Sequence, residues 1–344
     1  MRIGIQISTS PEQKTGIEEY VEQIIKNLMM LEESKKHQFF LYNRENLKWP
    51  FKKGWTQIRL SLKMLKNRPD ILFVPAHTFP IIHPKLVVTI HGLEYEYLPK
   101  MYSPFRRKVL RYLTKRNLKK ADKVIVPSQN TKEDLIKFYK ADPEKIFTIY
   151  HGVSVREQDG KGVRNMQGIE KTKQPCLLYL GRIEERKNIE GLIRAFEILK
   201  KKYKIPHKLV LAGPIDTRYK TQDTKHKNDV VFTGYVDQNK KWQLLKNADV
   251  FIFPSFYEGF GFPALEAQAA DIPVVASDVS SLPEILGNSA LLINPKDSVE
   301  IAEAVYKIIK NPKLKKVLIK KGHENIRRFS WKKCARETLK ILCA

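Results

Sequence analysis

Short, strongly apolar runs alternate with longer amphipathic stretches along most of this 344-residue chain. The runs at 71–74, 86–90 and 250–253 have the length of buried strands and are bounded by turn residues. The stretch 17–31 instead carries apolar residues at helical spacing. Repeated strand–helix units with short connections form open, mostly parallel sheets flanked by helices. The sequence therefore predicts an α/β protein.

A break in this alternation divides the chain. Residues 153–174 are polar and show little periodicity, and the strand–helix pattern restarts at Cys176. A chain of this length also exceeds the usual size of a single hydrophobic core. We therefore expect two α/β domains, residues 1–152 and residues 153–328.

The cysteines and the hydropathy pattern indicate where such a chain works. Cys176, Cys334 and Cys343 are odd in number and lack metal-binding spacing, which favours a reducing compartment over a disulfide framework. No apolar run has the length of a membrane span, and the N-terminus resembles a first strand more than a signal peptide. The expected location is the cytoplasm.

The charge is strongly positive, with 63 Lys and Arg against 37 Asp and Glu, a net charge of +26. Such an excess predicts attraction to polyanions, anionic lipid or phosphorylated ligands. Residues 105–120 combine many cations with apolar residues near helical spacing. This helix could rest on an anionic membrane at the inner face of the plasma membrane, or pack on the core with a solvated basic face.

A loop with two glycines and a carboxylate follows the strand at 250–253. The glycines let the backbone approach a ligand closely, and Pro263 suits the first turn of a following helix. The free amides of that helix start would form an anion site for a diphosphate. Glu266, one turn into the helix, could bind two ribose hydroxyls. The alternative is an ordinary helix entry. The candidate residues are Glu258, Gly259, Phe260, Gly261, Phe262 and Glu266.

A basic loop follows the strand at 176–180. Gly181 permits a sharp exit from this strand, and Arg182 and Lys187 precede a helix that begins near Asn188. An arginine offers a planar fork of donors for phosphate oxygens, and a lysine offers a mobile point charge. A basic loop can also be merely solvated, but together with the loop at 254–266 it predicts a nucleotide-phosphate site.

Both loops resemble the retaining glycosyltransferases of family four. Glu258 and Glu266 have the E-x7-E spacing of that family, and 181–188 resembles its Gly-Arg…Lys-Asn loop. Similarity continues over 271–287, and more weakly at 89–91, 126–128 and 149–153. The resemblance implies a GT-B fold: two Rossmann-like domains facing across a cleft, with the C-terminal helix, 329–344, packing back on the first domain. Further similarity is to bacterial mannosyltransferases of polysaccharide assembly.

The resemblance also implies roles for individual residues. Arg182, Lys187 and the amides around Gly261 would hold the donor diphosphate, Glu266 the ribose, and Glu258 the transferred sugar. His91 is a further catalytic candidate, although His91-Gly92 replaces the family's frequent His-Asp. Gly16, ahead of a helix predicted from Ile17, resembles the glycine-rich first loop. Acceptor-side candidates are Glu94, Tyr95 and Glu96.

The activity that this resemblance implies is retaining, metal-independent hexosyl transfer. The donor would be a nucleotide diphosphate sugar, with GDP-mannose favoured and a UDP-sugar as the alternative, and no further cofactor is expected. The acceptor would be a glycan or lipid-linked molecule in cell-surface polysaccharide or glycolipid synthesis. The sequence contains no helix-turn-helix, zinc-site or RNA-binding signature, so nucleic acid is not expected as a partner. The alternatives are a catalytically inactive GT-B scaffold and a polyanion-binding protein.

Overall fold

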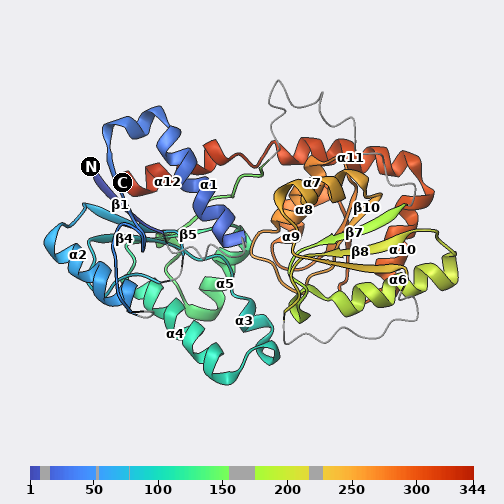
Figure 1. The fold of residues 1–344 in the computed structure, drawn as a ribbon, viewed down its shortest axis with the longest axis horizontal. Coiled ribbons are helices and arrows are strands. Elements are labelled where there is room, and N and C mark those ends of the chain that lie inside the picture. The colour runs from blue at the N-terminus through green and yellow to red at the C-terminus, as the bar shows by residue number, and fades with distance from the viewer. Residues whose placement is uncertain (8–15, 52–53, 77, 155–174, 217–227) are drawn as a thin grey trace. The chain divides into compact units, whose positions relative to one another are not determined.

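The computed structural model describes residues 1–7, 16–51, 54–76, 78–154, 175–216 and 228–344. Their contacts group them into two compact units. Unit 1 comprises Met1–Gly152 and Phe329–Ala344, and unit 2 comprises Val153–Arg328 (Figure 1). Most of the predicted linker, 155–174, lies outside the described residues.

Unit 1 contains a six-stranded sheet of order β2-β1-β3-β4-β5-β6, in which all neighbouring strands are parallel. Its inner strands β1, β3, β4 and β5 are mostly buried, as expected for a parallel sheet covered on both faces, whereas the edge strands β2 and β6 are partly exposed. The strands are β1 (Arg2–Gln6), β2 (Gln38–Tyr42), β3 (Ile71–Val74), β4 (Lys85–Thr89), β5 (Lys123–Val126) and β6 (Ile146–Thr148).

Helices cover both faces of this sheet. One face packs against α2, α4 and α5, whose apolar side chains share a buried cluster with Leu72 and Val88. On the other side lie α1 and the C-terminal α12, which contact each other (Figure 1). The helices are α1 (Gly16–Met30), α2 (Ser61–Lys66) after a π-helical turn (Trp55–Leu60), α3 (Glu94–Tyr97), α4 (Pro104–Lys120), α5 (Gln129–Tyr139) and α12 (Trp331–Cys343).

Unit 2 repeats the plan with a parallel sheet of order β12-β11-β10-β7-β8-β9. Its strands are β7 (Cys176–Leu180), β8 (Lys208–Ala212), β9 (Val230–Gly234), β10 (Val250–Phe253), β11 (Val274–Ser277) and β12 (Leu291–Ile293). Its helices are α6 (Ile189–Tyr203), α7 (Gln238–Asn247), α8 (Phe262–Ala269), α9 (Leu282–Leu286), α10 (Ser298–Lys310) and α11 (Pro312–Ile326).

The predicted fold class is confirmed, because both sheets are parallel and are flanked by helices. Several short elements were not predicted: the edge strand β2, the helical segment 55–66, α3 and α9. Helix α5 begins directly after Ser128, whose hydroxyl accepts a hydrogen bond from the Thr131 amide at 3.2 Å. Within the described part of the chain, no helix combines the length and the apolarity that a membrane crossing needs.

Candidate functional site

The two sequence-predicted loops lie side by side because of the strand order of unit 2. The chain adds β8 and β9 on one side of β7, whereas β10, β11 and β12 lie on the other side. The order therefore reverses between β7 and β10, which pair directly, with Val250 opposite Leu177. In open α/β sheets ligands bind at such a switch point, beyond the carboxyl ends of the strands. The loops 181–188 and 254–261 follow β7 and β10 respectively, so they meet at this point.

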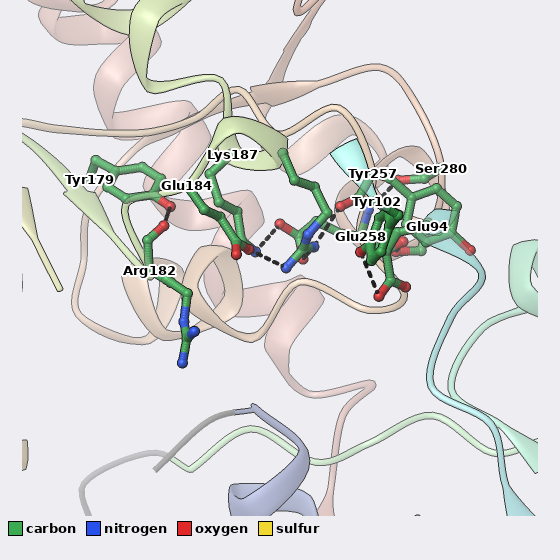
Figure 2. A network of polar contacts seen from close by, with 11 residues as sticks. Glu94, Tyr102, Tyr179, Arg182, Glu184, Lys187, Tyr257, Glu258 and Ser280 are labelled. Atoms are coloured by element: carbon green, nitrogen blue, oxygen red, sulfur yellow. Dashed lines mark hydrogen bonds and ion pairs between the residues drawn. The ribbon is translucent and has the colours of Figure 1, made fainter. Parts of the chain in front are cut away.

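A buried ion pair joins the two loops. The Nζ atom of Lys187 lies 2.5 Å from Oε1 of Glu258, and both side chains are about nine-tenths buried. A second cation, Arg186, lies 3.6 Å from Oε2 of Glu258 and donates to the Tyr257 carbonyl oxygen at 3.0 Å. Figure 2 shows Lys187 and Glu258 pointing toward one another. The lysine ammonium has three donors, and the bond to Glu258 uses one of them.

Hydrogen bonds to the backbone hold Glu258 in place. The Glu258 amide donates to the Ser280 hydroxyl at 2.9 Å, and the Ser281 hydroxyl donates to the Glu258 carbonyl oxygen at 2.9 Å. The Phe256 amide donates to the Arg186 carbonyl oxygen at 3.0 Å. The two loops are therefore braced against each other and against the segment after β11.

Burial and neighbouring charge act in opposite directions on this pair. Burial raises the pKa of the Glu258 carboxyl, but Lys187 and Arg186 together outweigh it, and the pKa lies below its ordinary value. Burial and the charge of Arg186 lower the pKa of the Lys187 ammonium, against the opposing effect of Glu258. Charged side chains with shifted pKa values are concentrated at functional sites, and this pair lies at the switch point of the sheet.

Glu266 lies one turn into α8 and is also paired. Its Oε1 accepts a hydrogen bond from Nζ of Lys241, on α7, at 2.6 Å. Gly261 precedes α8 with φ +102°, and no side chain caps the helix start. Pro263 lacks an amide hydrogen, and the Ala264 amide donates to the Gly261 carbonyl oxygen at 3.2 Å. The attraction of this helix start for an anion therefore comes from the backbone around Gly261 and from the helix dipole.

The remaining candidates of unit 2 lie around this helix start. Phe260 is buried and Phe262 half-buried, and their rings meet edge to face at 5.1 Å. Gly259, half-buried, separates Glu258 from Phe260. Arg182 is exposed, and its side chain points away from the Lys187–Glu258 pair (Figure 2). The structure therefore brings Lys187 and Glu258 together, while Arg182 projects separately from the same loop.

His91 and Gly16 belong to unit 1. Nε2 of His91 lies 2.9 Å from the Pro75 carbonyl oxygen, and its ring is 5.0 Å from that of Tyr20 and 5.7 Å from that of His151. Gly16 is the exposed first residue of α1, rather than a loop residue ahead of it.

The acceptor-side candidates take part in a buried polar network. The Glu96 carboxylate pairs with Arg107 at 3.2 Å and Arg111 at 3.0 Å, and accepts a hydrogen bond from the Tyr139 hydroxyl at 2.6 Å. Tyr95 is buried as well, whereas Glu94 is half-buried and accepts a hydrogen bond from the Tyr102 hydroxyl. Glu96 and Tyr95 therefore join α3 to α4 and α5.

Not among the predicted site residues were Arg186, Lys241 and the serines at 280–281. Arg186 directly precedes Lys187, so the basic loop itself was a usable signal. Lys241 is one of several lysines on a basic helix, and nothing local distinguishes it. Among the described residues, no three His, Cys, Asp or Glu side chains lie close enough to hold a metal ion.

Family models match both halves of the chain. Residues 164–325 match the model of glycosyl transferases group 1, and residues 16–157 match that of glycosyltransferase family 4. The chain is 26% identical over 263 residues to O-antigen chain mannosyltransferase B of Escherichia coli, covering 74% of this chain and 69% of the relative. It is 30% identical over 287 residues to an uncharacterised glycosyltransferase of Methanocaldococcus jannaschii, covering 78% of this chain and 72% of the relative.

Solved structures share the fold over nearly the whole chain. Sucrose-phosphate synthase from Thermosynechococcus elongatus superimposes with a TM-score of 0.74 at 21% identity, covering 99% of this chain and 98% of that one. Anabaena HepE, in complex with UDP and glucose, superimposes with a TM-score of 0.71 at 18% identity, covering 100% and 99%. At these identities the likeness concerns the fold.

Proposed function

Because this chain belongs to glycosyltransferase family 4 and has the GT-B fold, we propose that it is a retaining, metal-independent hexosyltransferase. It moves a hexose, with mannose favoured, from a nucleotide diphosphate sugar to a glycan or lipid-linked acceptor. The setting is cell-surface polysaccharide or glycolipid synthesis. Polysaccharide assembly is favoured because two relatives are named O-antigen chain mannosyltransferases.

One observation carries the proposal: the buried Lys187–Glu258 pair lies at the sheet's switch point, on the two loops that also hold Arg182 and the start of α8. A buried charge pair costs desolvation energy, and well-packed apolar residues would often be at least as stable. Its presence beside an uncapped helix start is therefore better explained by ligand binding than by stability. An inactive scaffold would not need it.

The arrangement suits departure of a nucleoside diphosphate. The amides around Gly261, at the start of α8, would bind the diphosphate, with Lys187 and the exposed Arg182 supplying positive charge. As the sugar–phosphate bond breaks, negative charge grows on the leaving oxygen, and preorganised positive groups stabilise it. Glu258, kept ionised by its cations, would bind hydroxyls of the transferred sugar. Retention would follow from attack on the same face, with the leaving phosphate oxygen taking the acceptor proton.

The nucleotide half would be held by the second pair. Glu266 would accept hydrogen bonds from the ribose hydroxyls, with Lys241 keeping its carboxylate in place. GDP-mannose is the favoured donor because the relatives include mannosyltransferases. A UDP-sugar is the alternative, since HepE was solved with UDP and glucose. In unit 1, we propose that His91 contacts the reacting sugar and that Gly16 allows the backbone to approach the donor closely.

Thermal unfolding with nucleotides tests this assignment. We expect GDP or GDP-mannose to raise the melting temperature, because a ligand at one hundred times its Kd stabilises the native state by about 2.7 kcal/mol. Chelator should not change the shift. Arg182→Ala should reduce it, whereas Arg194→Ala, an exposed arginine on α6, should not.

The outcomes separate the candidate functions. If only UDP species stabilise the protein, the donor is a UDP-sugar and not GDP-mannose. If the stabilisation depends on a divalent cation, metal independence is overturned. No shift with any nucleotide, in a folded sample that still binds heparin, would favour a scaffold or a polyanion-binding protein. Retention is tested by the anomeric configuration of the product, read by NMR.

A further inference from the structure

The helical segment 55–66 exposes a row of aliphatic side chains. Ile58, Leu62 and Leu65, spaced by four and three residues, are 49%, 46% and 62% exposed. Trp55, Leu60 and Met64 of the same segment are buried in the core cluster. The segment is thus apolar on two sides, and only one of them is needed for folding.

The following loop extends this row. Ile81 and Ile82 are 65% and 39% exposed. Their amides donate to the Ser61 hydroxyl at 2.9 and 3.3 Å, which holds both residues beside the helical segment. Five aliphatic side chains therefore form one exposed patch, whereas single exposed apolar residues are common and need no explanation.

A second apolar row lies on α4. Phe105, Val109 and Tyr112 occupy positions i, i+4 and i+7, and are 79%, 38% and 65% exposed. Helices α2 and α4 cover the same face of the unit 1 sheet, because both pack on the same core cluster. The Arg116 guanidinium of α4 lies 4.0 Å from the Phe79 ring centre, in the loop that carries Ile81. We name these two rows together the α2–α4 surface.

Both rows lie in stretches without acidic residues. No Asp or Glu occurs between Glu45 and Asp70, or between Glu96 and Asp122, although both stretches are rich in Lys and Arg. On α4, Lys108, Lys115 and Lys119 are exposed beside the apolar row. On α2, Lys66 is exposed next to Leu65. Apolar side chains ringed by cations match the chemistry of an anionic bilayer, with acyl chains below phosphate groups.

We propose that the α2–α4 surface docks unit 1 on an anionic lipid bilayer through both rows together. The aliphatic and aromatic side chains enter the boundary between headgroups and acyl chains, and the lysines contact lipid phosphates. A polyanion such as nucleic acid would use the cations but leave the aliphatic side chains in water. Docking would bring the enzyme to a lipid-linked acceptor, and only this last consequence rests on the proposed function.

Vesicle sedimentation tests the docking. The full chain is mixed with vesicles of phosphatidylcholine alone, or with phosphatidylglycerol added, at low and at high salt. We expect sedimentation with the anionic vesicles only, weakened by salt because screening shortens the reach of the charges. The triple variant Leu62→Ser, Leu65→Ser, Ile81→Ser should lower partitioning at least about tenfold, since three inserted side chains are lost. Phe105→Ser with Tyr112→Ser should act in the same direction.

A charge-neutral control distinguishes docking through this surface from non-specific hydrophobic adsorption. Val299→Ser with Val317→Ser removes two residues of unit 2 with similar exposure, and should leave partitioning unchanged. Insertion is read directly by an environment-sensitive fluorophore on Leu65→Cys in a Cys343→Ser background, because Cys343 is the exposed native cysteine while Cys176 and Cys334 are buried. Its emission should shift to the blue with anionic vesicles.

Three outcomes would overturn the docking. One is no sedimentation with anionic vesicles at low salt. Another is sedimentation that the apolar variants leave unchanged, which would indicate charge alone. The third is a dimer in solution that the same variants dissociate, which would assign the surface to a second copy of the chain. Each is distinct from failure of the proposed function, because nucleotide stabilisation is measured without vesicles on the same variants.

Discussion

Each carboxylate that the sequence assigns to donor binding has a cationic partner from a different element. Glu258, in the loop after β10, is paired with Lys187 from the loop after β7, and Glu266 of α8 with Lys241 of α7. Two bare carboxylates beside a diphosphate site would repel the ligand. Because the lysines neutralise them, the site can present carboxylates to hydroxyl groups and still bind an anion.

Lys241 provides a test at this scale. In Lys241→Met, Glu266 loses the cation that holds its carboxylate, so we expect the Kd for the donor nucleotide to rise about tenfold. Lys241→Arg should retain most of the affinity. The measurement is calorimetric titration with the nucleoside diphosphate and its 2′-deoxy analogue.

The neighbouring exposed lysine is the control: Lys240→Met should change the affinity little. If Lys241 acts through Glu266 on the ribose, the variant should also discriminate less between the ribonucleotide and the deoxynucleotide. Unchanged discrimination with weakened binding would mean that the lysine contacts another part of the ligand.

Among the elements, the turns after β7 and β8 are packed against each other. Gly213 has φ +144°, and a Cβ atom there would lie 2.0 Å from the Gly181 carbonyl oxygen. The Gly181 amide in turn donates to the Ala212 carbonyl oxygen at 2.9 Å. The start of the basic loop therefore depends on a glycine in the adjacent turn.

Gly213→Ala should destabilise unit 2 by at least about 3 kcal/mol, because both a backbone strain and a backbone clash are introduced. Gly234→Ala is the matched control. It also has positive φ, +67°, but no atom lies within 4 Å of the added Cβ, so a loss of about 1 kcal/mol is expected. Urea unfolding midpoints measure both. Equal losses would show that the turns do not pack as described.

For the whole molecule, buried ionisable groups set the dependence of stability on pH. His151 is fully buried among the rings of Tyr20, His91 and Trp331. Burial, with a smaller contribution from His91, holds the pKa of His151 well below its ordinary value of 6.5. The side chain is thus neutral in the folded protein at pH 7.

The folded-state pKa is the lower one, so the unfolded chain binds more protons below pH 6.5. The free energy of unfolding should therefore fall as the pH drops from about 7 to 5, by up to about 1.4 kcal/mol per pH unit from this group. His151→Gln should flatten the dependence in that window, and His83→Gln, elsewhere in unit 1, should not. Urea unfolding at several pH values measures it, and equal slopes in all three proteins would contradict the assignment.

Local signals in the sequence were enough to predict the α/β class, most strands and helices, and the two loops that carry the candidate site. Strand length, helical spacing and glycine positions are properties of neighbouring residues, so they can be read without a fold. Local sequence was also enough to identify the E-x7-E spacing, Lys187 and the resemblance to family 4. The family and the fold are confirmed.

Only the tertiary structure decided which of these residues meet. The sheet order places β7 beside β10 and thereby joins Lys187 to Glu258, which are 71 residues apart. The pairing of Lys241 with Glu266 and the exposed row at Ile58, Leu62 and Leu65 were not predicted. Apolar spacing shows that a helix has an apolar face, but not whether the sheet covers that face. Burial and ion pairing depend on contacts between distant residues, and these exist only once the chain has folded.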